Sequence, residues 1–169
     1  MNSADYQYRV PSPDDAAAMV DVHFAAVHAV VNDHYPDHLL HAWSPVPDER
    51  RRAWLASVIA SPAAVSCLVE SSGQQVLGFG LVDTESGVLK ALYVHPNATG
   101  CGLGKGLLQH LENQCRSLGL TALTLNASYN AERFYGRNGY AALGPSVQVL
   151  ANGESMGAVS MFKSLGTNV

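Results

Sequence analysis

Residues 88–108 read VLKALYVHPNATGCGLGKGLL, and this stretch decides the fold. Apolar residues at 88–94 predict a strand, a glycine-rich turn follows, and Leu103, Leu107 and Leu108 begin a pattern typical of a helix. The first backbone N–H groups of a helix have no intrahelical partner and lie at its positive end, where they can bind a phosphate. Glycine lets an anion approach the backbone without a Cβ in the way. The segment therefore predicts a phosphate-binding loop; a flexible loop ahead of a surface helix is the alternative.

Two common phosphate motifs do not fit this loop. The P-loop pattern requires a glycine where Thr99 stands and a serine or threonine where Gly106 stands. The dinucleotide fingerprint GxGxxG requires a third glycine at the place of Lys105 or Leu107. The loop therefore matches neither of these phosphate-binding classes.

The rest of the chain predicts a mixed α/β domain. Short turns at 71–73 and 84–87 favour antiparallel hairpins in the middle of the chain. We expect one central, mostly antiparallel twisted sheet of about seven strands flanked by helices. The predicted strands are 6–10, 64–69, 76–82, 88–94, 120–125, 140–149 and 157–165; the predicted helices run from Ser12 to near Asn32–Asp33, over 37–43, after Pro47, over 100–119 and over 131–137.

Composition narrows the class of protein. The 169 residues suit a single domain, 1–169. The net charge is −4 with only three lysines, which argues against a nucleic-acid partner. No apolar run approaches the roughly 18 residues of a membrane span, and the N-terminus lacks the apolar core of a secretory signal. Three cysteines without CxxC spacing indicate free thiols. We therefore expect a cytoplasmic protein without a membrane partner.

Two motifs in the right order resemble the Gcn5-related N-acetyltransferase (GNAT) family. Residues 99–104 resemble its acyl-CoA loop, Q/R-x-x-G-x-G/A, and the flanking LYVHP and KGLLQHLE are similar too. Residues 130–140, NAERFYGRNGY, resemble a later family segment that holds a Phe-Tyr pair ahead of a glycine and an aromatic residue. Thr99 replaces the family's Gln or Arg. Because backbone amides are the main phosphate ligands, we expect weaker cofactor binding without its loss.

The resemblance implies transfer of an acetyl group from acetyl-CoA to a primary amine, by direct attack and without a metal. It places the phenol of Tyr135 near the CoA sulfur as the general acid, and a backbone N–H near Val94 on the thioester carbonyl. A core tyrosine beside Phe134 is the alternative. The implied cofactor contacts are Leu92, Tyr93, Val94, Thr99, Gly100, Cys101, Gly102, Leu103, Gly104, Lys105, Asn130 and Tyr135.

The general base is left open. Many family members carry a glutamate at the place of Val88, and nearby Lys90 is cationic. Asn126 stands where a similar bacterial subgroup has an acidic residue, two positions before Ser128. A base must come from elsewhere, through water, or the enzyme must bind the small neutral fraction of the amine.

The segment 28–43 is the candidate acceptor side. It holds four of the seven histidines, and in the family the first two helices and their connection wall the acceptor pocket. A histidine pKa near 6.5 suits a base, so His34 is the candidate base, and His28, Tyr35 and Trp43 are candidate substrate contacts. Each has a packing or surface role as its alternative. Pro36 interrupts the helical spacing of His34, His38 and His41, which disfavours a metal site.

The aromatic, histidine-rich segment favours a closed pocket and therefore a small-molecule amine. A protein or peptide acceptor is the first alternative. The second is a non-catalytic acyl-CoA-binding module, which is favoured by Thr99 in the loop and by Val88 in place of the glutamate. The sequence is compatible with a monomer or a homodimer.

Overall fold

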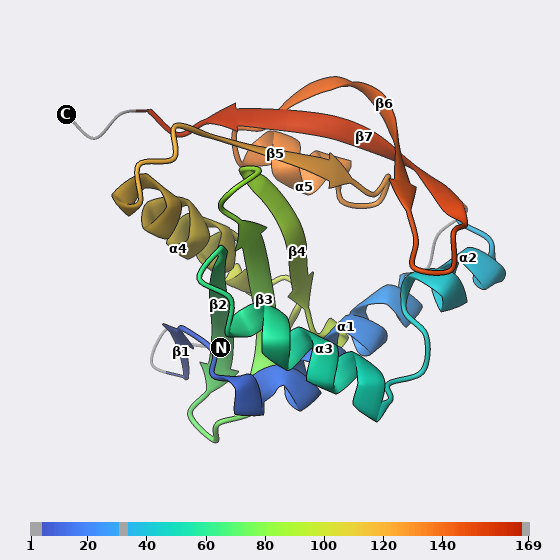
Figure 1. Ribbon diagram of the computed structural model, residues 1–169, viewed down its shortest axis with the longest axis vertical. Helices are drawn as coiled ribbons and strands as arrows, with labels where there is room; N and C mark the ends of the chain where they lie inside the picture. Colours follow the sequence, from blue (N-terminus) through green and yellow to red (C-terminus); the bar gives the residue numbers. More distant parts are fainter. Residues whose placement is uncertain (1–4, 31–33, 167–169) are drawn as a thin grey trace.

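The computed structural model describes residues 5–30 and 34–166, and Figure 1 shows helices on both faces of a central sheet. The elements are β1 (Tyr6–Arg9), η1 (Pro13–Asp15), α1 (Ala16–His28), α2 (Asp37–Trp43), α3 (Glu49–Ile59), β2 (Ala64–Ser71), β3 (Val76–Asp83), β4 (Val88–Val94), η2 (Pro96–Ala98), α4 (Leu103–Ser117), β5 (Ala122–Ala127), α5 (Glu132–Arg137), β6 (Ala141–Val149) and β7 (Ser155–Ser164). The predicted end of the first helix at Asn32–Asp33 lies outside the described residues; α1 ends at His28.

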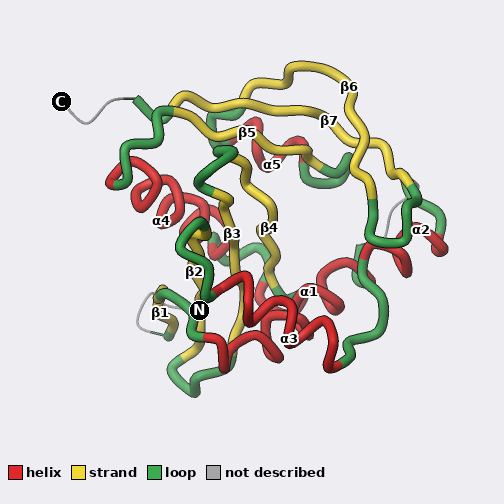
Figure 2. Tube along the Cα trace, in the orientation of Figure 1, coloured by secondary structure: helices red, strands yellow, loops and turns green. Residues whose placement is uncertain are grey.

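The described strands form one seven-stranded sheet in the order β1-β2-β3-β4-β5-β7-β6. Every neighbouring pair is antiparallel except β4 and β5, which are parallel. The expected mostly antiparallel sheet within a mixed α/β domain is confirmed. Figures 1 and 2 show that the antiparallel strands β2, β3 and β4 lie along one axis, whereas β5, β7 and β6 lie across this axis above them. The sheet therefore consists of two parts that diverge between β4 and β5.

Helix α4 covers one face of the first part of the sheet. Its buried residues Leu103, Leu107 and Leu111 recur at helical spacing and pack against β2, β3 and β4. Glycines let the helix approach closely, because a Cβ at Gly80 would lie 2.5 Å from Leu111 Cδ1. The close packing fixes where the N-terminus of α4, and with it the glycine loop, meets the sheet.

Helices α1 and α3 cover the opposite face, where Met19, Leu68 and Phe79 are buried in a second cluster. A third cluster joins α1 and α2 to the hairpin of β6 and β7 through Val27, Leu40, Leu150 and Met156. In Figure 1 this hairpin extends from the sheet to α2. The N-terminal helices α1 and α2 thereby contact the C-terminal hairpin of β6 and β7, beyond the gap between β4 and β5.

Candidate functional site

Strands β4 and β5 separate almost at once. Their parallel pairing has a single register pair, Val88 with Thr124. Strand β4 also carries a bulge, since Leu81 pairs with Ala91 and Val82 pairs with Leu89, which leaves Lys90 without a partner on β3. Beyond Val88 the edge of β4 is therefore open to a ligand rather than to another strand.

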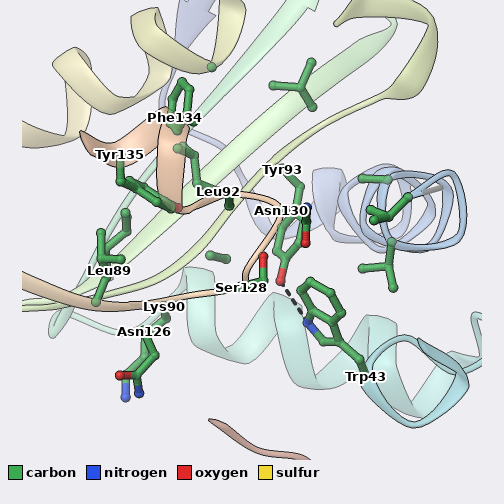
Figure 3. A pocket seen from close by; sticks show the side chains of 18 of the residues that line it. Trp43, Leu89, Lys90, Leu92, Tyr93, Asn126, Ser128, Asn130, Phe134 and Tyr135 are labelled. Atoms are coloured by element: carbon green, nitrogen blue, oxygen red, sulfur yellow. Dashed lines mark hydrogen bonds between the residues drawn. The ribbon is translucent and has the colours of Figure 1, made fainter. Parts of the chain in front are cut away.

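A cavity of about 350 Å³ occupies this gap. Figure 3 shows side chains from several elements directed around it. The lining residues come from α1 and the turn after it, the end of α2, β4, the glycine loop, β5, the β5–α5 connection and α5: Ala26, Val27, Val30, Trp43, Leu89, Lys90, Ala91, Leu92, Tyr93, Val94, Thr99, Gly104, Leu125, Asn126, Ser128, Asn130, Ala131, Phe134 and Tyr135. The volume suits a small ligand.

The predicted phosphate loop forms one end of the cavity. Gly100 and Gly102 have φ angles of 78° and 80°, which favour glycine, and Gly102 is the N-cap of α4. The first backbone bond at this helix end runs from Gly106 N to Gly102 O, at 3.1 Å. The N–H groups of the preceding turn are therefore available to an anion at the positive end of a 15-residue helix.

The glycines of this loop have different roles. No atom lies within 4 Å of a Cβ built at Gly100 or Gly102, so the space in front of this backbone is open. Gly104 lines the cavity, and a Cβ there would lie 3.5 Å from the Phe134 ring. A Cβ at Gly106 would overlap the Tyr8 hydroxyl, which makes Gly106 a packing residue. The open space at Gly100 and Gly102 is what a pyrophosphate requires.

The structure places the other predicted cofactor residues as follows. Leu92, Tyr93, Val94, Thr99, Asn130 and Tyr135 line the cavity with Gly104. Cys101 and Lys105 are exposed on the loop, whereas the Leu103 side chain is 1% exposed in the core, so that only its backbone can meet a ligand. The Thr99 hydroxyl donates to Pro96 O at 3.0 Å and stabilises the turn before the loop.

Tyr135 is buried, and in Figure 3 its ring extends from α5 into the cavity. Burial, and then the nearby Tyr93, raises the pKa of its phenol well above the ordinary value. Its ring packs edge-on against Phe134 and Tyr140, at 5.2 and 5.6 Å between centroids. Among the described residues no group hydrogen-bonds to the Tyr135 hydroxyl. The phenol is therefore a fixed, protonated group that can donate into the cavity.

A polar network on the other side of β4 holds Tyr93. Trp43 Nε1 donates to the Tyr93 hydroxyl at 3.1 Å, and burial raises the pKa of Tyr93 to about 12. The His23 ring lies 4.4 Å from the Tyr93 ring. Arg51 Nη2 and Ser44 Oγ both lie 3.0 Å from His23 Nδ1. Because a guanidinium can only donate, Nδ1 accepts and the proton is on Nε2. Burial, and then Arg51, lowers the pKa of His23 to about 3, so the ring is neutral.

Of the predicted acceptor contacts, only Trp43 lines the cavity. His28 Nε2 lies 2.7 Å from Ser44 O and joins α1 to the end of α2. The Tyr35 hydroxyl donates to Gly157 O at 2.6 Å and accepts from Tyr129 N at 2.9 Å, which ties this segment to β7. His34 is exposed, with its ring 5.8 Å from that of Tyr129. The structure does not bring His28, His34 or Tyr35 to the cavity wall.

Sequence reasoning missed several residues at the cavity. Helix α1 presents Ala26 and Val27 to it rather than His28, and Val30 follows just after the helix ends. His23 and Arg51 do not line the cavity but belong to the network around Tyr93; a histidine within an apolar helix and an arginine three residues after the Asp48 cap are the signals that the sequence offers for them. No Asp, Glu or His is among the described residues that line the cavity. In the described ranges no three metal-binding side chains cluster, and no helix is long and apolar enough to span a membrane.

Comparison with known proteins agrees with this geometry. Residues 42–161 match the acetyltransferase (GNAT) domain family. An IAA acetyltransferase of Azospirillum brasilense is 34% identical over 106 residues, 59% of this chain and 69% of that protein.

Solved structures show the same fold. A Gcn5-related N-acetyltransferase from Rhodopseudomonas palustris superposes with a TM-score of 0.83 at 27% identity, over 97% of this chain and 98% of that one. A phosphinothricin acetyltransferase from Sinorhizobium meliloti, solved with acetyl-CoA, has a TM-score of 0.73 at 18% identity, over 96% of this chain and 89% of that one. With a family match over most of its length and the divergent strands that bound the cavity, this chain belongs to the GNAT acetyltransferases.

Proposed function

We propose that this acyltransferase uses acetyl-CoA to acetylate the primary amine of a small molecule. One observation carries the proposal: the Tyr135 phenol and Gly104 of the glycine loop line the same cavity, so that a thiol ester bound by the loop has a proton donor within that cavity. The acetyl-CoA bound to the Sinorhizobium meliloti structure supports the choice of donor. The names of two similar proteins, an IAA acetyltransferase and a phosphinothricin acetyltransferase, refer to small molecules and support a small acceptor.

The cofactor supplies an activated acetyl thioester, and the residues of this chain bind and orient it. The N–H groups that follow Gly102 hold the pyrophosphate at the positive end of α4. Asn130 and the open edge of β4 contact the arm, and a backbone N–H near Val94 polarises the carbonyl as its oxygen gains charge. With the glycine loop and β4 on either side of the arm, this proposal puts the carbonyl next to the part of the cavity lined by Trp43, where the amine is expected to bind.

The neutral amine forms the new C–N bond, the C–S bond breaks, and Tyr135 donates its proton to the leaving sulfur. A thiol has a pKa of about 8.5 and a free phenol about 10, so burial of Tyr135 makes the transfer more uphill while it keeps the donor protonated. The amine loses its proton to water, because the described cavity wall offers no carboxylate or imidazole, and a proton from water returns to Tyr135 before the next turnover. We propose this path in place of a base at His34.

Acetyl-CoA turnover with a panel of primary amines tests the function. Thiol release above the rate without amine, with N-acetyl product found by mass spectrometry, is the expected result. If CoA raises the melting temperature but no amine increases thiol release, the protein is a binding module. If the protein neither binds CoA nor releases thiol, the assignment of the loop itself is wrong.

A further inference from the structure

A second, smaller cavity adjoins the first. It has a volume of about 110 Å³, and it shares Trp43, Lys90, Tyr93, Asn126 and Ser128 with the first cavity. Gln148, Leu150, Met156 and Ala158 of the β6–β7 hairpin complete it. The shared residues therefore mark the junction between the gap in the sheet and a pocket that lies on the acceptor side.

The charge at this junction is positive. Lys90 is the residue that the bulge leaves unpaired on β4, and it lines both cavities. Its charge contributes to the lowered pKa of Asp83, after the hydrogen bonds from Ser86 and Glu85. No carboxylate of the described residues lies within 4.0 Å of Lys90 Nζ. The ammonium is therefore available to a ligand.

The neighbouring polar groups at the junction also offer hydrogen-bond donors. Ser146 Oγ donates to Asn126 Oδ1 at 2.9 Å, which leaves the Asn126 N–H groups free to donate. The half-buried Ser128 hydroxyl lines the same junction. Figure 3 shows Lys90 and Asn126 on the side of the cavity away from Phe134. A cation beside two donors is complementary to a carboxylate and not to an ammonium group.

Apart from Gln148, the rest of the small cavity is lined by aromatic and aliphatic side chains. Trp43 and Tyr93 form its aromatic wall, and Leu150, Met156 and Ala158 are nearby. No Asp or Glu is among the described residues that line either cavity. We infer that the acceptor amine carries a carboxylate on a compact apolar body, with the carboxylate bound by Lys90, Asn126 and Ser128. This inference rests on the proposed function, because it names the substrate class of the same site.

Binding of amine-free probes tests the inference without turnover. In the presence of CoA, calorimetry compares benzoate with benzamide, which keeps the shape and removes the charge. Benzoate should bind about fivefold more tightly than benzamide, which corresponds to the upper end of what one exposed ion pair contributes. Lys90→Gln should abolish this preference. Arg50→Gln is the matched control, because Arg50 is exposed on α3 and lines neither cavity. Equal binding of both probes, no benzoate binding, or an unchanged preference in Lys90→Gln overturns the inference.

A second comparison separates this inference from the proposed function. In 4-aminobenzoate and 4-aminobenzamide the amine is neutral at pH 7 in both, so only the carboxylate differs. The benzoate should have the higher kcat/KM in the wild type, and Lys90→Gln should remove the difference. Acetylation of both at equal kcat/KM leaves the acetyltransferase in place and refutes the carboxylate site. Benzoate binding that depends on Lys90, without acetylation of any amine, refutes the proposed function instead.

Discussion

Trp43 Nε1 donates a 3.1 Å hydrogen bond to the Tyr93 hydroxyl, and this contact joins the end of helix α2 to strand β4. Both residues line the two cavities on the side opposite Phe134, as Figure 3 shows. The bond fixes an aromatic wall against which an acceptor can pack.

Trp43→Phe removes the donor and part of this wall. We expect KM for the amine to rise about fivefold, or about 1 kcal/mol, because the ring that packs against the acceptor is smaller and no longer held by its bond to Tyr93, while KM for acetyl-CoA stays within about twofold. Tyr35→Phe is the matched control. It removes a buried hydroxyl with two backbone partners, so it should cost about 1–3 kcal/mol of unfolding free energy and leave both KM values unchanged. Equal changes in the two KM values for Trp43→Phe would show that Trp43 only packs.

Tyr135→Phe keeps the buried ring and removes the proton. Because a positioned acid contributes roughly 10²–10⁴-fold, kcat should fall by at least about tenfold, the lower limit allowing for protons from water. CoA affinity should change little. Tyr140→Phe is the control, since the Tyr140 hydroxyl donates to Glu112 at 3.2 Å and does not line the cavity. An unchanged kcat in Tyr135→Phe, with chemistry rate-limiting, removes Tyr135 from the mechanism.

The pH dependence of kcat/KM should have only a rising limb in the ordinary assay range. Burial raises the pKa of Tyr135, so the acid stays protonated as pH increases. A lysine-like amine with a pKa of about 10.4 gains neutral form about tenfold per pH unit. Initial rates between pH 6 and 9 measure the slope, with a weakly basic aromatic amine as the control that should show none. A falling limb near pH 8 would indicate a different acid.

Gly102→Val tests the loop. At a φ of 80° a β-branched residue is strained, and its side chain would occupy the open space in front of the N–H groups. The variant should fold and lose the increase in melting temperature that CoA gives the wild type. Gly106→Ala should behave in the opposite way, with a lower melting temperature from the overlap with Tyr8 and a retained CoA shift. A normal CoA shift in Gly102→Val would exclude the loop as the phosphate site.

His23 makes the fold sensitive to acid. Its pKa is lowered from 6.5 to about 3, so between these values the unfolded chain binds a proton that the folded chain does not. Its contribution is complete above pH 6.5 and is lost as pH falls, by about 2 kcal/mol at pH 5. Urea unfolding at pH 7 and pH 5 measures it. His23→Gln should lose less stability than the wild type over this interval, and an equal loss would show that His23 does not carry the effect.

The glycine loop and helix α4 could be predicted because their signals are local. Glycines, the helix start and the leucine stripe lie within one stretch of chain. The acceptor wall could not be predicted in the same way. Whether Val27 or His28 turns toward the cavity depends on the rotation of α1 against the sheet, which distant contacts with Leu150 and Met156 determine. The position of Lys90, on which its inferred role rests, depends on a bulge that the alternation of residues 88–94 does not reveal.

The single register pair between Val88 and Thr124 also affects how this enzyme could be redesigned. The gap is made by diverging backbones and by glycines, whereas the opposite wall is made by side chains such as Trp43 and Lys90. Replacement of those side chains should change which acceptor amine binds, without closing the gap between β4 and β5 that is proposed to hold acetyl-CoA. Under the proposed function, a library at Trp43, Lys90 and the β6–β7 hairpin should explore new acceptors while the glycine loop and the cofactor contacts at residues 92–94 of β4 stay unaltered.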